Sequence, residues 1–325
     1  IITLKGFISE NTLFGSNQNL PSSLEVQSVT HFPYVILRIF LGLSIYGSSV
    51  RICQSQTFPP LGDRGRTVPS QTYDLAQRAL AYGNFSGALE LAQQEYKGCL
   101  KFGTERWIDS AAAAAIIGEC LFETGRYREA VGFYNEAITH TSSHGNWLQE
   151  IRFPNQPLKA RNDRLRQLWG PLPRQIALSD LPSRLTIRLG TSDPQSVLQG
   201  GGVLSAPIEY PIRPHEIMRS LAISLYRRTD LLGPLAKDGQ ALKNVSSWLQ
   251  QRPAIPNHFS QAWIDVCLGI AYWSEARNEQ ALPLLNRGSL LENHFDHSLT
   301  PWALLVAGRI AIDTNDFERA VKVLE

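Results

Sequence analysis

Two pairs of histidines have a spacing at which their side chains could share a metal ion. His140 and His144 are four residues apart, and His294 and His297 are three apart. One turn of helix would place each pair on one face. However, serine and glycine surround the first pair, the second lies in a turn-rich stretch, and neither has a carboxylate at matching spacing. We therefore interpret all four as surface histidines and predict no metal site.

Three consecutive glycines, residues 200–202, could in principle cradle a phosphate. They lack the Gly-Lys-Ser/Thr ending of a P-loop, and no helix start follows them, so we interpret them as a flexible connection. The sequence contains neither the Gly-x-Ser-x-Gly elbow of serine hydrolases nor a complete His-Glu-x-x-His zinc motif, because His215–Glu216 lacks the second histidine. We predict no catalytic residues and no cofactor, and therefore a protein that is not an enzyme.

The four cysteines do not form a metal or redox motif. Cys53, Cys99, Cys120 and Cys267 show no close CxxC pairing. The last three lie among apolar residues in predicted helices, where a free cysteine usually behaves as a small hydrophobic side chain. A disulfide bridge between Cys99 and Cys120 is conceivable, and the sequence alone leaves it open.

The elements that must carry any function are predicted to be helices in pairs. Residues 109–122 are good helix formers interrupted only by Gly118, and Gly125 then suits a left-handed residue after a helix end. A second apolar stripe at helical spacing follows from Tyr127 to Ile138. The small residues Gly118 and Ala130 would allow the two helix axes to approach closely. This segment is therefore predicted to be a helical hairpin.

Weaker copies of this hairpin recur along the chain. They are aligned on an alanine near the start of the second helix: Ala88, Ala130, Ala281 and Ala320. A glycine stands twelve residues before three of these alanines: Gly118, Gly269 and Gly308. A further candidate unit covers residues 217–248, but Pro234 occupies the place of its alanine. A proline at that place is tolerated only if it lies in the first turn of the second helix.

This pattern resembles the tetratricopeptide repeat (TPR) family, whose unit of about 34 residues consists of two antiparallel helices. The alanines here are 42 residues apart between Ala88 and Ala130, and 39 apart between Ala281 and Ala320. The units are therefore degenerate and lengthened. The resemblance implies a mainly α fold, an α-solenoid of antiparallel hairpins, which in this chain also carries a small β-hairpin insertion.

That insertion is expected between residues 141 and 214, where the helical pattern fails. Prolines at 154, 157, 171 and 173 interrupt any helix, and from Leu185 to Leu189 apolar and polar residues alternate as in a strand. A second β-like run covers residues 203–212. We predict a small β-hairpin packed on the helical array.

The amino-terminal part contains an apolar run from Tyr34 to Tyr46, followed by small residues. Its length matches the centre of a secretory signal and is short for a membrane-spanning helix. About thirty residues precede it and the chain starts at Ile1, so a later true start or an internal fragment remains open, as does a buried first helix of the array. We predict export to a bacterial periplasm or cell envelope, with a cytoplasmic location as the alternative.

The expected organisation then follows along the chain. It comprises a disordered or upstream segment (1–31), a signal-like apolar segment (32–53), a linker (54–69), TPR-like repeats (70–140), the insertion (141–214) and further TPR-like repeats (215–325). The last copy stops five residues after Ala320, which leaves an apolar face uncovered. We therefore expect more chain, or another subunit, to follow, and a homo-oligomer is one possibility.

Charge argues against a nucleic-acid partner. The 325 residues include 31 Lys+Arg and 29 Asp+Glu, a net charge of +2, and the basic residues are scattered. Membrane association is expected only through the amino-terminal apolar segment.

The TPR resemblance implies instead a protein or peptide partner in a concave groove lined by the first helix of each unit. The groove candidates are Tyr73, Gln77, Glu119, Phe122, Trp263, Trp273, Trp302 and Arg309. Aromatic residues and arginine often carry interface energy, although the tryptophans could equally be core residues between units. We predict a non-enzymatic interaction scaffold. The alternative is an enzyme or regulator whose site lies in the 141–214 insertion or in a missing downstream domain.

Overall fold

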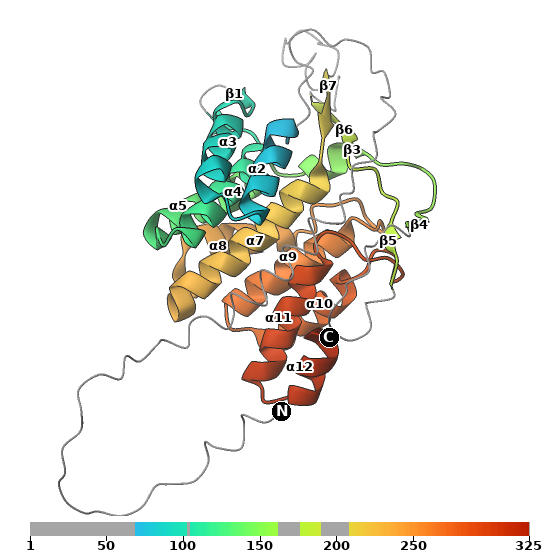
Figure 1. Cartoon of the computed structure of the whole chain (residues 1–325). Coiled ribbons are helices and arrows are strands. Elements are labelled where there is room, and N and C mark those ends of the chain that lie inside the picture. Colours follow the sequence, from blue (N-terminus) through green and yellow to red (C-terminus); the bar gives the residue numbers. More distant parts are fainter. Residues whose placement is uncertain (1–68, 103–104, 162–175, 190–207, 325) are drawn as a thin grey trace, which may run out of the picture. The chain divides into compact units, whose positions relative to one another are not determined.

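Five pairs of helices follow one another in a computed structural model that describes residues 69–102, 105–161, 176–189 and 208–324 (Figure 1). We call the first helix of each pair inner and the second outer. The pairs are α2 (Gln71–Ala81) with α3 (Phe85–Lys97), α4 (Ser110–Glu123) with α5 (Tyr127–Ser142), α7 (Pro214–Leu232) with α8 (Gln240–Gln250), α9 (Gln261–Ser274) with α10 (Asn278–Gly288), and α11 (Thr300–Asp313) with α12 (Phe317–Leu324).

The pairs stack as in a solenoid. Outer helices contact the next inner helix, α3 with α4, α5 with α7, α8 with α9 and α10 with α11. Consecutive inner helices also touch one another along the series α2, α4, α7, α9 and α11. Apolar faces are therefore covered mainly by neighbouring pairs, which is how a repeat array builds one continuous core. The predicted fold class, a mainly α solenoid of antiparallel hairpins with a small β insertion, is confirmed.

The recurring glycines allow the two helices of a pair to approach. A Cβ atom built at Gly118 would lie 2.6 Å from the Tyr134 ring, one at Gly269 would lie 2.8 Å from Leu285, and one at Gly308 would lie 2.6 Å from Leu324. In each case the obstacle is the outer helix of the same pair. The glycine thus makes room for a large side chain, which explains why the spacing of glycine and alanine recurs in the sequence.

Replacing Gly118 by alanine is expected to destabilise the protein by about 1–3 kcal/mol, since overpacking outweighs the higher helix propensity of alanine. Tyr134 is fully buried and cannot move aside easily. Gly132 in α5 is the matched control, because it is exposed and a Cβ atom there meets nothing within 4 Å. Gly132→Ala should stabilise by about 0.5–1 kcal/mol. Urea unfolding of both variants checks the prediction, and equal shifts of the same sign would contradict it.

The third pair is the irregular one. Pro234 was expected in the first turn of the second helix, and this expectation is wrong. The proline lies in a short 3-10 helix, η3 (Gly233–Asp238), and the outer helix α8 begins only at Gln240. Proline is tolerated near the start of η3 because a residue at the start of a helix donates no intrahelical hydrogen bond from its backbone nitrogen. The linker displaces α8, which packs on α5, η3 and α9.

The described part of the insertion contains the predicted hairpin and three further short strands. β6 (Leu185–Leu189) pairs antiparallel with β7 (Ile208–Ile212), with Leu185 opposite Ile212, and β3 (Ile151–Arg152) pairs with the other edge of β6. In the sequence between β3 and β6, β4 (Ala160–Arg161) pairs with β5 (Leu178–Ser179). Short elements also flank the second pair, namely β1 (Lys101–Phe102), β2 (Glu105–Arg106) and η2 (Trp147–Glu150).

The insertion also reaches the later pairs. The backbone N–H of Asp296, in the linker between α10 and α11, donates to the carbonyl of Ala177 at 2.9 Å, and the N–H of Ser179 donates to the Asp296 carbonyl at 3.3 Å. Phe153, just after β3, packs 5.3 Å from Phe259 at the start of α9, measured between ring centroids. The segment predicted as an insertion therefore contacts the linkers that precede α9 and α11.

Several expectations fall outside the described residues. These are the disordered segment, the apolar run at residues 34–46 and nearly all of the linker that follows it. Among the described residues, none of the helices combines the length and apolarity that crossing a membrane requires. Cys120 and Cys267 are buried free thiols, and the buried Cys99 thiol donates to the Glu95 carbonyl at 3.2 Å.

The junction between the first two pairs buries a carboxyl group. Asp109, directly before α4, is 1% exposed, and its Oδ2 accepts the Leu100 N–H at 3.0 Å. Its Oδ1 has no hydrogen-bond partner among the described residues. Burial raises the pKa of Asp109 to about 7, and nearby Glu95 adds to the effect, whereas hydrogen bonds from Leu100 and Cys99 oppose it. Folding therefore favours the protonated form.

We expect this proton to make stability fall as the pH rises. The unfolded carboxyl loses its proton near pH 4, while the folded one keeps it until about pH 7. Between these values the folded state holds one more proton, so the free energy of unfolding decreases with increasing pH. In Asp109→Asn this contribution should vanish. Urea unfolding from pH 4 to 7 checks it, and parallel pH profiles for the variant and the wild type would contradict the assignment.

Candidate functional site

The inner helix α7 lies at the centre of the described array. It contacts α4, α5, α9 and α11, and nearly all of its residues are buried from Glu216 to Arg228. Four of those buried residues carry formal charges: Glu216, Arg219, Arg227 and Arg228. Buried charges require partners. Glu216, Arg219 and Arg227 have partners on α2, α4 and α5, and Arg228 donates to Asn135 on α5 and to the nearby Ala236 carbonyl. Three contacts join α7 to the other inner helices.

The first contact joins α7 to α2 of the first pair. The Tyr73 hydroxyl donates to Glu216 Oε2 at 2.9 Å, and the Gln77 amide reaches the same oxygen at 3.0 Å. Arg219 donates to Glu216 at 2.7 Å and to the Tyr73 oxygen at 3.1 Å. Burial alone would raise the pKa of Glu216, but Arg219, then His215 and Arg213, hold it well below its usual range. Glu216 is therefore an ionised acceptor shared by two inner helices.

The second contact joins α7 to α4 and α5. Arg227 binds Glu119 through two nitrogens, at 2.9 Å and 3.1 Å, and the Tyr134 hydroxyl donates to Glu119 at 2.5 Å. The Arg227 guanidinium also stacks on Phe122, with 4.0 Å from its central carbon to the ring centroid. Arg227 and Glu119 are each 3% exposed. Burial, together with Glu119, raises the pKa of Tyr134 well above its usual value, so the phenol stays a donor.

The third contact joins α7 to α9 and α11. Tyr226 stacks on Trp273 with ring centroids 5.6 Å apart, and Trp302 packs on the same tyrosine at 5.5 Å. Arg309 donates to Asp230 at 3.0 Å and lies 5.9 Å from the Trp273 centroid. This cluster is partly exposed, because Trp273 and Arg309 keep accessible surface.

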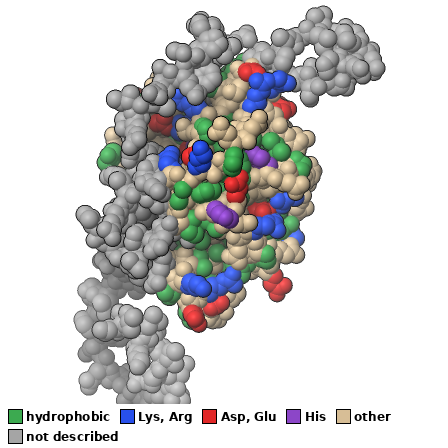
Figure 2. Space-filling view, turned by 90° about the vertical axis from the view of Figure 1, so that its right-hand side faces the viewer, with side chains coloured by type: hydrophobic (Ala, Val, Ile, Leu, Met, Phe, Trp, Pro, Cys, Tyr) green, Lys and Arg blue, Asp and Glu red, His purple; other side chains and the backbone are tan. Residues whose placement is uncertain are grey.

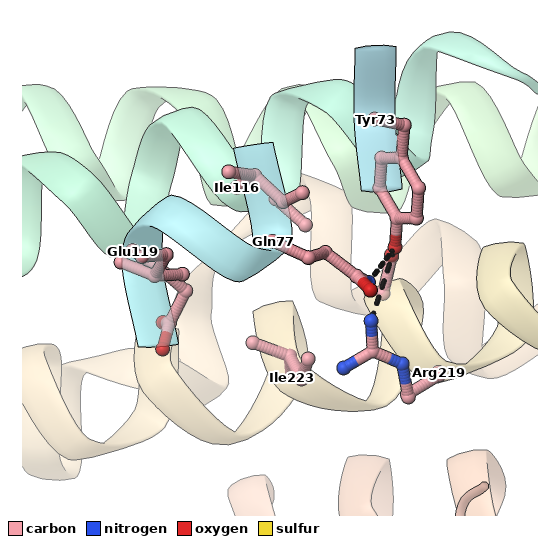
Figure 3. Close-up of a pocket in the computed structure, with 9 residues that line it drawn as sticks. Tyr73, Gln77, Ile116, Glu119, Arg219 and Ile223 are labelled. Carbon is pink, nitrogen blue, oxygen red and sulfur yellow. Dashed lines mark hydrogen bonds between the residues drawn. The ribbon is translucent and has the colours of Figure 1, made fainter. Parts of the chain in front are cut away.

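A hollow opens between α2, α4 and α7, beside the first polar contact (Figure 3). The space inside it that is open to a water-sized molecule is about 20 Å3, and all empty space including the open mouth is about 340 Å3. The apolar part of its lining consists of Leu80, Ala115, Ile116 and Ile223. Figure 3 shows Gln77, Tyr73 and Arg219 converging at one edge and Glu119 at another. The hollow is thus an apolar depression with hydrogen-bonding groups on its border.

The structure places seven of the eight predicted groove residues around α7. Tyr73 and Gln77 lie at the first contact, Glu119 and Phe122 at the second, and Trp273, Trp302 and Arg309 at the third. All seven lie on inner helices. Four of them, however, are not open to solvent. Tyr73, Glu119, Phe122 and Trp302 are each at most 5% exposed and fill the space between inner helices.

Trp263 lies apart from the others. It is fully buried and packs near Phe153 of the insertion and Phe259, with centroid distances of 6.1 Å and 6.2 Å. Trp263 is therefore a core residue, which is one of the two interpretations that the sequence left open. Of the predicted groove residues, Gln77, Trp273 and Arg309 keep accessible surface. They remain candidates for binding at the inner face, together with the lining of the hollow.

Sequence reasoning missed the residues that α7 contributes. Arg219, Arg227 and Ile223 were not among the candidates, because Pro234 weakened the case for this unit. The sequence contained one signal. Arg219 and Arg227, eight positions apart, interrupt the apolar stripe of this helix on the face that a solenoid buries. Such charges indicate buried partners on neighbouring helices.

Within the ranges that the structure describes, no group of three or more metal-binding side chains comes together. On the face shown in Figure 2, basic and acidic side chains are interspersed with apolar ones. His144 contacts the Arg106 carbonyl at 3.0 Å, and His297 is buried against the Gly288 carbonyl at 2.8 Å, so the expectation of a surface position is wrong for His297.

Comparison with known proteins gives little guidance. No family model and no curated protein matches the chain. Two solved structures are similar, described as nearly identical TPR-like repeats of a kinesin light chain from Podosopora anserina and a variant of it. They are 15% and 14% identical, cover 78% of this chain and 90% of their own, and have TM-scores of 0.34 and 0.33. A likeness this distant adds nothing to what the helices themselves show.

Proposed function

We propose that the protein is a non-enzymatic interaction scaffold that holds a partner protein at the hollow between α2, α4 and α7. The observation that carries the proposal is the hollow's composition. Four apolar side chains form its lining, and Gln77 and Arg219 offer polar groups at its edge. A concave apolar depression with a few fixed polar groups is the usual form of a recognition site in proteins. Its occupant would be one apolar side chain of a partner segment, and the hollow would widen to accept it, since only about 20 Å3 is open to a water-sized molecule.

The inner face favours such a single anchor over a peptide lying along the whole array. α7 is tied to α2 through Glu216 and to α11 through Arg309. These contacts occupy the space between inner helices that a continuous groove would need. The partner segment would therefore cross the inner face at the hollow.

The walls of the hollow are held by a buried hydrogen bond and a buried ion pair. Arg219 on α7 is fixed to Tyr73 on α2, and Arg227 on α7 is fixed to Glu119 on α4. Because the lining helices are joined before any partner arrives, little ordering entropy is lost on binding.

Selection from a library of random peptides tests the proposal. The immobilised protein should enrich peptides that share one leucine, isoleucine, methionine or phenylalanine. The same selection on Ala115→Leu, in which a larger side chain fills the hollow, should not enrich them. Failure to enrich any peptide on the wild type, or equal enrichment on both proteins, would overturn the proposal.

Export to a bacterial cell envelope stays a prediction. It rests on the apolar run at residues 34–46, which lies outside the described residues.

A further inference from the structure

The insertion follows the second pair in sequence, yet its described part contacts the linkers of pairs on both sides of it. β7 ends at Ile212 and leads directly into the start of α7 (Figure 1). Tyr210 on β7 packs against Trp107, in the linker before α4, with ring centroids 6.3 Å apart. Trp107 is 2% exposed, so this contact belongs to the core. The sheet therefore joins the starts of the second and third inner helices.

Phe153 extends this connection to the fourth inner helix, α9. It follows β3 and packs against His258 and Phe259 in the linker before α9, with ring centroids 4.5 Å and 5.3 Å away. Trp263, in the first turn of α9, lies 6.1 Å from the same ring. Aromatic pairs at these distances stabilise beyond the area that they bury. Because β3 pairs with β6, and β6 with β7, the cluster is fixed to the strand that enters α7.

Backbone hydrogen bonds extend the connection to the fifth inner helix, α11. The N–H of Asp296, in the linker before α11, donates to the Ala177 carbonyl at 2.9 Å, and the N–H of Ser179 donates to the Asp296 carbonyl at 3.3 Å. Leu178 and Asp296 form a parallel bridge between these two bonds. Asp296 is 2% exposed, so water cannot easily replace its partners. The linker before α11 is thus attached to the β4–β5 pair.

These contacts differ from those of a simple repeat array, in which each pair touches mainly its neighbours and small rotations at each interface set the curvature. In such an array the rotations are independent of one another. Here one element touches the starts of α4, α7, α9 and α11, or the linkers before them. Turning one pair relative to the next would separate Phe153 from its aromatic partners or break the hydrogen bonds to Asp296. The rotations are therefore coupled.

We propose that the insertion acts as a clamp, formed by Phe153, β5 and β7, which fixes the angles between the second and later pairs. The clamp holds the inner helices in one arrangement. Its release would let the pairs rotate against one another while each pair stays folded, because the close contacts within a pair, such as Gly269 with Leu285, do not involve the insertion. This inference does not depend on the hollow or on a partner.

Loosening the clamp without changing a helix tests the inference. Phe153→Ala removes the aromatic contact, and Ser179→Pro removes the N–H that donates to Asp296. The full chain carries spin-labelled amino acids at Arg128 on α5 and Glu279 on α10, which are exposed positions on outer helices. Pulsed electron paramagnetic resonance should show a narrow distribution of label distances in the wild type and a broader one in the double variant. The Asp296 amide should exchange its hydrogen at least about tenfold faster in the double variant.

Leu285→Ala is the matched control, because Leu285 is 1% exposed and packs on Gly269 of its own pair. It should lower the unfolding midpoint and leave the width of the distance distribution unchanged. Circular dichroism checks that the variants are folded. If the double variant is not, Phe153→Leu takes its place and should also broaden the distribution. A distribution as narrow as that of the wild type would overturn the inference. Equal broadening in Leu285→Ala would also overturn it, since any loss of stability would then loosen the array.

Discussion

Replacing Arg227 by methionine is expected to lower the free energy of unfolding by about 3–5 kcal/mol. The substitution removes both hydrogen bonds from Arg227 to Glu119, which is only 3% exposed. An uncompensated buried charge is far more costly than a missing surface ion pair. Guanidinium chloride unfolding followed by circular dichroism measures the change.

Two controls separate this cause from a general loss of packing. Adding Glu119→Met and Tyr134→Phe to Arg227→Met removes the stranded charge and the hydroxyl that donates to it, and should recover most of the lost stability. Arg126→Met breaks an exposed pair with Glu129 and should barely move the unfolding midpoint. If the triple variant is no more stable than the single one, the buried ion pair is not what joins α7 to α4.

Filling the hollow is expected to have the largest effect on binding. Ala115→Leu should weaken the affinity for a selected peptide by at least about tenfold, which corresponds to the loss of 1.4 kcal/mol or more of apolar contact. Ala115 lines the hollow on α4. Gln93→Leu adds the same side chain on the exposed outer helix α3 and should leave the affinity unchanged. Isothermal titration calorimetry compares the two.

The unfolding midpoint of Ala115→Leu must be measured alongside. Binding lost together with folding would show only that the core cannot accept a leucine, and in that case Ile223→Ala, which enlarges the hollow, provides the second comparison. Ile223→Ala should alter which peptides are selected, in favour of bulkier apolar residues. Identical peptide preferences in this variant and the wild type would contradict the proposed contact.

The sequence predicts the hairpins well because their determinants are local. The spacing of Gly118 and Ala130 recurs in other units, and the structure shows why: each glycine faces a large side chain of its own pair. The β-hairpin is likewise encoded by the alternation from Leu185 to Leu189. Both patterns depend on contacts between residues close in sequence.

The inner face could not be predicted in the same way. Tyr73 meets Glu216 across 143 residues, and Glu119 meets Arg227 across 108. Such contacts depend on how far the array curves, which is the sum of many small rotations between pairs and leaves no periodic signal. A groove expected to be open is therefore largely filled by α7. The displaced α8 has a similar origin, since Pro234 selects η3 rather than the first turn of a longer helix.

The most direct test of the central proposal is to locate the bound apolar side chain. A selected peptide would carry a photoreactive diazirine on its shared apolar residue and be irradiated in complex with the full chain. Mass spectrometry of the digested product then finds the attachment points. We expect labelling at Leu80, Ile116 or Ile223, suppressed in Ala115→Leu. Labelling confined to other residues, or unchanged in Ala115→Leu, would contradict it.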